Sequence, residues 1–280
     1  MPNYTFETPH PVALTVKNLG GKVVIQATDD GTTTVELTGA HADEATVTQL
    51  GGAINVTAPH CDWLDAGMWH NWLRRNRIDI TVTAPQDSDV TLQLGGGETQ
   101  ILGRFGRLEV RPGAGEVHVT DANGETSVHL GAGNVNIDSI SARTRVINGA
   151  GNIHIGQASG DVKLQLGTGD VSIDAMSGPV RVKNGAGSVK IGDVTGDLTV
   201  DSGVGSTSIE RISSGRFTYK GSGGDVKIGV ANGTPTWTEL STVVGRVTNN
   251  LPSVGEPQPG QDHVELRVST VSGAITLRPV

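Results

Sequence analysis

Apolar and polar residues alternate with a period of two along most of the chain, in short phrases that begin with glycine. A clear example is GSVKIGDVT at residues 187–195, followed at once by GDLTVDSGV at residues 196–204. Such alternation is typical of a β-strand with one buried face. Glycine supplies the positive φ angle that a tight corner needs. The pattern therefore predicts short strands joined by glycine corners.

The phrases recur every nine residues. Between Gly97 and Gly205, twelve of thirteen positions spaced nine apart are glycine, and Ala142 is the exception. The fourth residue after each register position is apolar, and the third is polar. The seventh residue alternates between apolar, as at Val194, and glycine, as at Gly203. Two phrases therefore make one eighteen-residue repeating unit, which holds two strands.

A two-strand unit cannot bury its own apolar face, whereas stacked units bury a continuous aliphatic column. We therefore predict an all-β fold, a single-stranded right-handed β-solenoid (β-helix) in which each eighteen-residue unit forms one coil. The handedness follows the usual crossover preference, and stacked strands are expected ~4.8 Å apart.

The ends of the chain depart from the regular repeat. We expect one domain over residues 1–280, with irregular coils over 1–96 and regular nine- and eighteen-residue repeats over 97–233. Residues 234–280 hold two similar stretches, ELSTVVGRVT and RVSTVSGAIT, separated by a loop rich in proline and glycine at 249–263. These stretches are expected to close the rod.

The stretch CDWLDAGMWHNWLRRN at residues 61–76 interrupts the strand pattern. Met68 and Trp72 share one helical face, Trp69 lies beside them, and Trp63 precedes them, so a short helical insertion is predicted. Because the end of a solenoid needs cover, we expect this segment to cap the first coil. The rival hypothesis is that its tryptophans dock a partner or a membrane surface.

Composition narrows the functions further. The net charge of −8 argues against a specific nucleic-acid binder, and the single cysteine, Cys61, excludes an intrachain disulfide. The first residues lack the basic and apolar regions of a signal peptide, and no apolar run approaches the ~20 residues of a membrane helix. We expect a cytoplasmic location and no transmembrane segment, with envelope association as the open alternative.

Metal and cofactor chemistry find little support. Calcium-binding β-rolls also use nine-residue glycine phrases, but this chain has valine where their ligating aspartate falls. Asp170, Asp197 and Asp225 are scattered and are expected to be solvated turn carboxylates. His118 and His154 are expected on the surface, roughly 10 Å apart by strand spacing, which is too far for one metal. We predict no metal site and no cofactor.

A series of basic residues is the main candidate site. Arg145, Lys163 and Arg181 recur once per eighteen-residue unit, so they are expected to stack on one outward face, with Arg143 and Lys183 pointing the same way. Neighbouring like charges repel, which implies countercharges or an anionic partner. A solvated surface is the simpler interpretation. The sharper hypothesis is a binding face for an anionic polymer or an acidic protein.

A family resemblance rests on the GxGxVxI phrases, on IDITVTAP followed by SDVTLQLGGG, and on the closing STVSGAITL. In these features residues 77–280 resemble the putative-adhesin family, bacterial β-strand-repeat proteins with a domain of unknown function. The resemblance implies a fold built on structural glycines and no established catalytic residues. It also implies an envelope-associated setting for many relatives.

Three functions are compatible with these observations. The first is a non-enzymatic scaffold or binding module, in the envelope- or stress-related interactions that the resemblance implies. The second is a rod that assembles end to end through an uncapped coil. The third and least favoured is a carbohydrate-active β-helix enzyme, since short corners leave no walls for a pocket. We therefore predict that the protein is not an enzyme.

Overall fold

Strands make up almost all of the computed structural model, which describes residues 2–59, 77–255 and 260–280. Within these ranges the one helical element is a 3-10 helix, η1 (Ala42–Glu44). The predicted all-β class is confirmed. No helix in the described part of the chain is long and apolar enough to cross a membrane.

The helical insertion predicted over residues 61–76 lies outside the described residues. The same holds for Trp63, Met68, Trp69 and Trp72, so the capping and docking hypotheses stay predictions.

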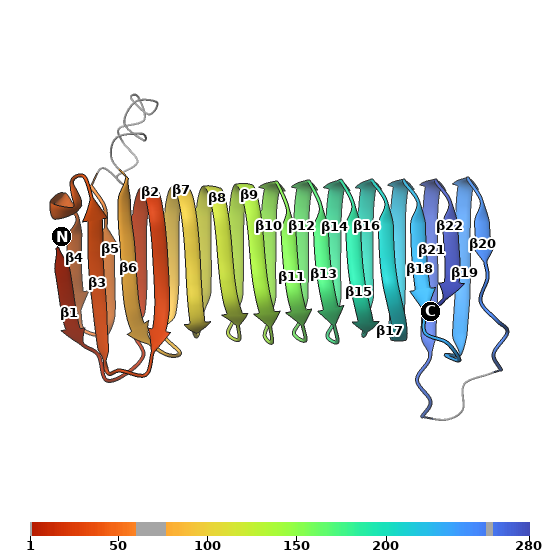
Figure 1. The fold of residues 1–280 in the computed structure, drawn as a ribbon, viewed down its shortest axis with the longest axis horizontal. Helices are drawn as coiled ribbons and strands as arrows, with labels where there is room; N and C mark the ends of the chain where they lie inside the picture. Colours follow the sequence, from red (N-terminus) through yellow and green to blue (C-terminus); the bar gives the residue numbers. More distant parts are fainter. Residues whose placement is uncertain (1, 60–76, 256–259) are drawn as a thin grey trace. The chain divides into compact units, whose positions relative to one another are not determined.

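The chain divides into two compact units, residues 1–139 and 140–280, and Figure 1 labels their strands. The strands that begin in the first unit are β1 (Asn3–Glu7), β2 (Ala13–Thr28), β3 (Thr32–Gly39), β4 (Thr46–Leu50), β5 (Ala53–Thr57), β6 (Ile78–Pro85), β7 (Asp89–Arg104), β8 (Leu108–Ala122) and β9 (Thr126–Ile140).

In the first unit, parallel and antiparallel pairs are combined. Strand β2 pairs in parallel with β5, β6 and β7, and β7 pairs with β8 one repeating unit later, as between Val90 and Leu108. The pairs β1–β3, β3–β6 and β4–β5 are antiparallel. Antiparallel pairs thus interrupt the expected irregular coils, and one of them, β4–β5, is a hairpin with a short turn at Gly51 and Gly52.

The second unit contains the regular repeat. Its strands are β10 (Thr144–Ala150), β11 (Ile153–Ala158), β12 (Val162–Thr168), β13 (Val171–Met176), β14 (Val180–Ala186), β15 (Val189–Thr195), β16 (Leu198–Val204), β17 (Thr207–Gly223), β18 (Val226–Val230), β19 (Thr236–Val244), β20 (Val247–Asn249), β21 (Val264–Ser272) and β22 (Ile275–Pro279).

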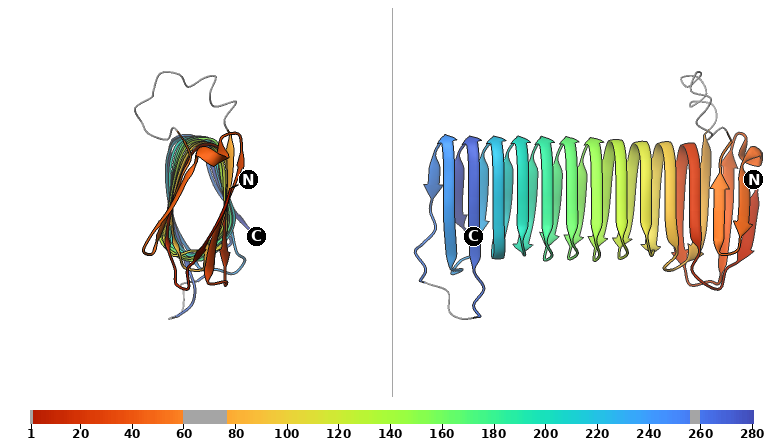
Figure 2. Two further views of the ribbon diagram at one scale, coloured as in Figure 1. Left: turned by 90° about the vertical axis from the view of Figure 1, so that its left-hand side faces the viewer. Right: turned by 180° about the vertical axis from the view of Figure 1, so that it is seen from behind.

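These strands form two facing layers (Figure 2). One layer runs β10–β12–β14–β16–β17, and the other runs β11–β13–β15–β17–β18. From β10 to β15, each strand pairs in parallel with the strand two places later, residue i with residue i+18. The register lengthens by one where an extra residue enters, as between Leu198 and Phe217. The predicted eighteen-residue register is confirmed in this unit.

The core lies between the two layers and consists mainly of small aliphatic side chains. Ile155, Ile173 and Ile191 are in register on successive strands, and all three are buried. Their polar neighbours His154, Ser172 and Lys190 alternate with them and face outward, as the period of two requires.

The corner glycines serve two purposes. In the regular repeat, every second register position, such as Gly169 and Gly187, has a positive φ. The alternate positions, such as Gly160, do not have a positive φ. At these positions an added Cβ would clash with the backbone of the previous coil. At Gly160 it would lie 2.2 Å from the Ala142 oxygen. The expectation of positive φ at every corner is therefore wrong, and Ala142 occupies a position of the second kind, where the backbone does not adopt a positive φ.

The closing strands are not stacked in sequence order. Strand β21 lies between β17 and β19, and β22 lies between β18 and β20. The coil made of β19 and β20 is therefore outermost in the second unit, although β21 and β22 come later in the chain. The loop after β20 supplies the length for this return, and the strand residues predicted in both closing stretches are present.

One part of the second-unit core is polar. The hydroxyl oxygens of Ser202, Thr207 and Tyr219 are buried and lie outside standard hydrogen-bond geometry with their neighbours. Burial raises the pKa of the Tyr219 hydroxyl, and the nearby Thr207 and Ser202 hydroxyls oppose this shift only in part. The folded state therefore favours the neutral phenol.

We expect Tyr219→Phe to unfold with a free energy equal to the parent's or higher by up to about 1 kcal/mol at neutral pH, because the buried hydroxyl lacks a well-formed partner. In the parent, the folded state keeps the phenol proton at a pH where the unfolded chain has lost it. The stability that this retained proton contributes is complete below about pH 10 and is lost as pH rises further. Denaturant melts from neutral pH to above pH 10 should show a smaller alkaline loss in the variant, and equal losses would contradict this account.

Candidate functional site

The predicted basic residues lie on one outward face of the second unit. Arg145 on β10, Lys163 on β12 and Arg181 on β14 are register partners on adjacent strands. The residues that follow them, Val146, Leu164 and Val182, are buried, so the basic side chains point to solvent. With strands ~4.8 Å apart, the three positive groups form a closely spaced row.

Arg143 and Lys183 extend this row in different ways. Lys183 is exposed on the same outward face of β14 as Arg181. Arg143 precedes β10, and its guanidinium Nε lies 3.7 Å from Asp161, which also lies 4.0 Å from the Lys163 ammonium group. Arg143 is therefore partly neutralised. We call the five residues Arg143, Arg145, Lys163, Arg181 and Lys183 the basic face.

Three members of the basic face are not neutralised by contact. Within the described ranges, no carboxylate lies within 4.0 Å of the charged groups of Arg145, Arg181 or Lys183. Asp201 on β16 is the register partner of Lys183 and limits the face on that side. The three residues therefore stack as the spacing predicts, and in the described part of the chain Asp161 is the carboxylate that contacts the basic face.

An open hollow of about 360 Å³ borders the basic face. Its lining residues come from β16 and β17, and they are Asp201, Ser202, Gly203, Lys220, Gly221 and Ser222. The hollow contains one carboxylate, Asp201, and one ammonium group, Lys220, which are register partners. The sequence analysis did not predict this hollow.

The aspartates considered as calcium ligands have another role. The Asp170 carboxylate accepts a hydrogen bond of 2.7 Å from the Ser188 backbone N–H of the next coil. Asp197 accepts one of 3.0 Å from the Arg216 N–H, and Asp225 one of 2.9 Å from the Ala274 N–H. Each carboxylate links two stacked corners. In the described ranges, no three histidine, cysteine, aspartate or glutamate residues come close enough to hold a metal ion.

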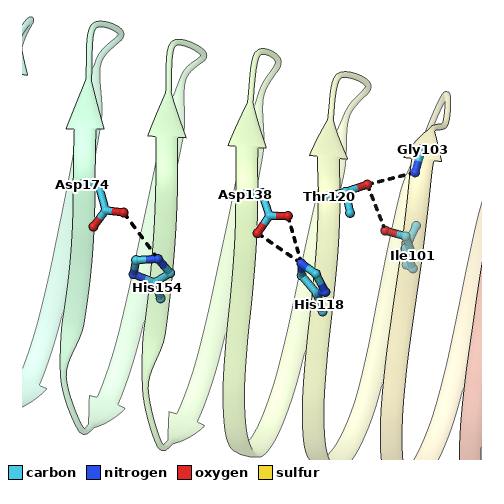
Figure 3. Close-up of polar contacts among 7 residues, drawn as sticks. All are labelled: Ile101, Gly103, His118, Thr120, Asp138, His154 and Asp174. Carbon is cyan, nitrogen blue, oxygen red and sulfur yellow. Dashed lines mark hydrogen bonds and ion pairs between the residues drawn. The ribbon is translucent and has the colours of Figure 1, made fainter.

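Each of the two candidate histidines pairs with an aspartate of its own unit (Figure 3). In the first unit, a His118 ring nitrogen lies 3.0 and 3.1 Å from the two oxygens of Asp138. In the second unit, a His154 ring nitrogen lies 3.6 Å from Asp174. In both pairs the aspartate follows the histidine by one eighteen-residue coil plus two positions. This spacing is visible in the sequence. The predicted surface location of both histidines is confirmed.

The strand pairing and the exposed face define the class of protein. It is an all-β repeat protein, in which glycine corners recur between stacked parallel strands and polar and charged side chains lie on the outward faces of the strands. The chain belongs to the Toastrack DUF4097 family, whose model matches residues 13–192. This match confirms the resemblance noted from the repeated phrases.

Several solved structures are similar over nearly the whole chain. One is a putative cell adhesion protein from Clostridium sporogenes ATCC 15579, with 13% identity over 100% of this chain and 99% of that chain, and a TM-score of 0.25. Another is a putative adhesin from Bacteroides fragilis NCTC 9343, with 13% identity, coverage of 99% and 96%, and a TM-score of 0.30. A putative adhesin from Parabacteroides merdae ATCC 43184 shows 8% identity, coverage of 99% and 96%, and a TM-score of 0.38. No curated protein matches the chain.

Proposed function

We propose that the protein is a non-enzymatic binding scaffold, whose repeated coils form a right-handed β-solenoid and whose basic face binds a linear anionic polymer. The observation that carries the proposal is the row of Arg145, Lys163 and Arg181, held in register on neighbouring paired strands. Like charges in neighbouring strands repel one another, so an anionic ligand that bridges them relieves this repulsion.

The shape of the basic face favours an extended ligand. Its positive groups recur at the strand spacing of ~4.8 Å along the stack, and a chain of repeated anionic groups can contact several at once. The overall net charge is −8, so attraction of a polyanion has to come from a local face rather than from the whole protein. An acidic protein segment is the alternative ligand, and an envelope setting is the one that the family resemblance implies.

Catalysis fits the described residues less well. Glycoside hydrolysis commonly uses two carboxyl groups that flank the bond to be cleaved. The hollow beside the basic face has a single carboxylate, Asp201, and it is open to solvent. We therefore propose binding without turnover.

The proposal is tested by charge removal on the basic face. Titration calorimetry with heparin at low salt should show binding that weakens as salt increases, because exposed charges are screened. The triple variant Arg145→Gln, Lys163→Gln, Arg181→Gln should bind about three- to hundredfold more weakly, since three contacts of about 0.2–1 kcal/mol each sum to about 0.6–3 kcal/mol and ~1.4 kcal/mol is a tenfold change.

A matched control removes the same charge from the other layer. Lys190, Arg211 and Lys227 are exposed on β15, β17 and β18. Replacing all three with glutamine should leave heparin affinity within about twofold of the parent, a difference of ~0.4 kcal/mol. Equal losses in both triple variants would mean diffuse electrostatic attraction, and no binding by the parent would reject the proposed polymer. Binding of a poly-glutamate peptide but not of heparin would favour an acidic protein.

A further inference from the structure

The outermost coil of the second unit ends in a free strand edge (Figure 1). Strand β19 pairs with β21 on one side, and no strand in the described part of the chain pairs with its other side. The outward face of this strand includes Trp237, with 49% of its surface exposed, and Val243, with 77% exposed. A nine-residue edge without a bulge is a template for pairing with another strand.

The backbone of β19 is ready to pair at this edge. The Val264 N–H donates to the Pro235 carbonyl, so the backbone carbonyl of residue 235 points toward β21. Because successive residues of a strand point their backbone groups to opposite sides, the amides of Thr238, Leu240 and Thr242 point to the free edge. These groups can form hydrogen bonds with a strand that docks there.

The core is also open at this coil. The inward residues Thr236, Thr238, Leu240 and Thr242 are only half-buried, whereas the inward residues that precede them in the stack, Val264, Leu266, Val268 and Thr270, are buried. The right-hand view of Figure 2 shows the blue outermost coil at the end of its unit. A partner at this edge would therefore cover apolar surface as well as pair backbone groups.

We propose that β19 binds β19 of a second copy of this chain, antiparallel, across a two-fold axis at Leu240. Leu240 is the middle residue of the strand, and this register pairs Thr238 with Thr242 of the second copy. In this register even-numbered residues oppose even-numbered ones, so inward side chains lie opposite inward side chains and outward side chains lie opposite outward ones. All six amide and carbonyl groups of Thr238, Leu240 and Thr242 in each copy then pair, giving about six hydrogen bonds.

The side chains of β19 are complementary to themselves in this register. Trp237 lies opposite Val243 of the second copy, an aromatic and β-branched pair of the kind that stabilises sheets. Glu239 lies opposite Ser241 of the second copy, so no like charges face each other directly. Glu239 is also held 3.5 Å from Arg267 of β21, whose guanidinium lies over the Trp237 ring. Leu240 lies opposite Leu240 of the second copy, on the inward face of the strand where the core is open.

The proposed contact closes on itself. An isologous interface uses the same surface on both copies, so pairing consumes both β19 edges and produces a dimer rather than a filament. This separates the inference from open-ended rod assembly, and it is independent of the basic face and its ligand.

Cross-linking tests the register directly. In a Cys61→Ser background, Leu240→Cys places two thiols opposite each other, with Cα atoms about 5.5 Å apart, a distance that suits a disulfide. Mild oxidation should give a covalent dimer. The control Thr242→Cys lies on the same face of the same strand, but its two copies are about 13 Å apart along the paired strands and should not cross-link. Equal cross-linking of both variants, or none at Leu240→Cys, would overturn the proposed register.

Sedimentation equilibrium of the full chain tests the oligomeric state. We expect a monomer–dimer equilibrium with no larger species, and a monomer for Leu240→Lys, which sets two like charges opposite each other. The control Val204→Lys changes a valine that is 64% exposed on β16, away from β19, and should dimerise like the parent. A parent that is monomeric at all concentrations, or an open-ended series of larger species, would overturn the proposal. If Leu240→Lys fails to fold, the cross-linking pair decides.

Discussion

Replacing Ile173 with aspartate is expected to unfold the protein or cause it to aggregate. Ile173 is 1% exposed and lies in the apolar column between its register partners Ile155 and Ile191. The new carboxylate would lack a partner there, and a buried unpaired charge is among the few changes that cost more than about 4 kcal/mol. This approaches the whole stability of a typical domain, about 5–15 kcal/mol. Thermal and urea unfolding of the purified variant would measure the loss.

The adjacent residue provides the control. Ser172 points outward between His154 on β11 and Lys190 on β15, so Ser172→Asp adds a carboxylate to a solvated surface. Its free energy of unfolding should stay within about 0.5 kcal/mol of the parent. If the two variants melted alike, the inward and outward assignment of β13 would be wrong.

The regular part of the fold was predictable because its two constraints are local and periodic. A strand with one buried face requires alternation, as at Ser172 and Ile173, and a corner requires a small residue at fixed spacing, as at Gly169 and Gly187. When both constraints repeat with every coil, the register between coils follows without further information. The sequence could not separate corners that need positive φ from corners that only lack space, because glycine satisfies both.

The ends of the chain could not be predicted in the same way. The stretches ELSTVVGRVT and RVSTVSGAIT have the same alternation, so their sequences do not predict that the second one lies between the first one and the rest of the stack. The order depends on which stretch better fills the column. Val264, Leu266 and Val268 of β21 are buried, whereas β19 presents Thr236, Thr238 and Leu240 at the same positions. The more apolar strand occupies the more buried place, a choice made by packing rather than by pattern.

The candidate site was predictable in position but not in chemistry. The regular spacing of Arg145, Lys163 and Arg181 defined a row, since residues at equal positions of successive coils stack. The ion pair of Arg143 with Asp161 depends on side-chain conformations at a corner, which periodicity does not encode. For the same reason, Asp170 could be interpreted from the sequence as solvated, although its carboxylate links two stacked corners.

Replacing Gly187 with alanine is expected to destabilise the protein by more than about 3 kcal/mol. Gly187 has a φ of 125°, where an L-residue is strained. An added Cβ would lie 2.0 Å from the Gly169 carbonyl oxygen and 2.6 Å from its carbon, both in the backbone of the stacked corner. Relief would require the two coils to separate and would weaken hydrogen bonds such as that from the Gly187 N–H to the Val204 oxygen, 2.9 Å long.

A second glycine in the same unit separates this packing effect from the general effect of an added methyl group. Gly223 lies at the end of β17, has no positive φ in the left-handed range, and an added Cβ there would meet no atom within 4 Å. Gly223→Ala should therefore keep the parent's stability or gain about 0.4–1 kcal/mol, because alanine restricts the unfolded chain. Urea unfolding of both variants would measure the difference. A Gly187→Ala variant as stable as Gly223→Ala would mean that the stacked corners yield to a methyl group, and that close coil contact does not explain the glycine series.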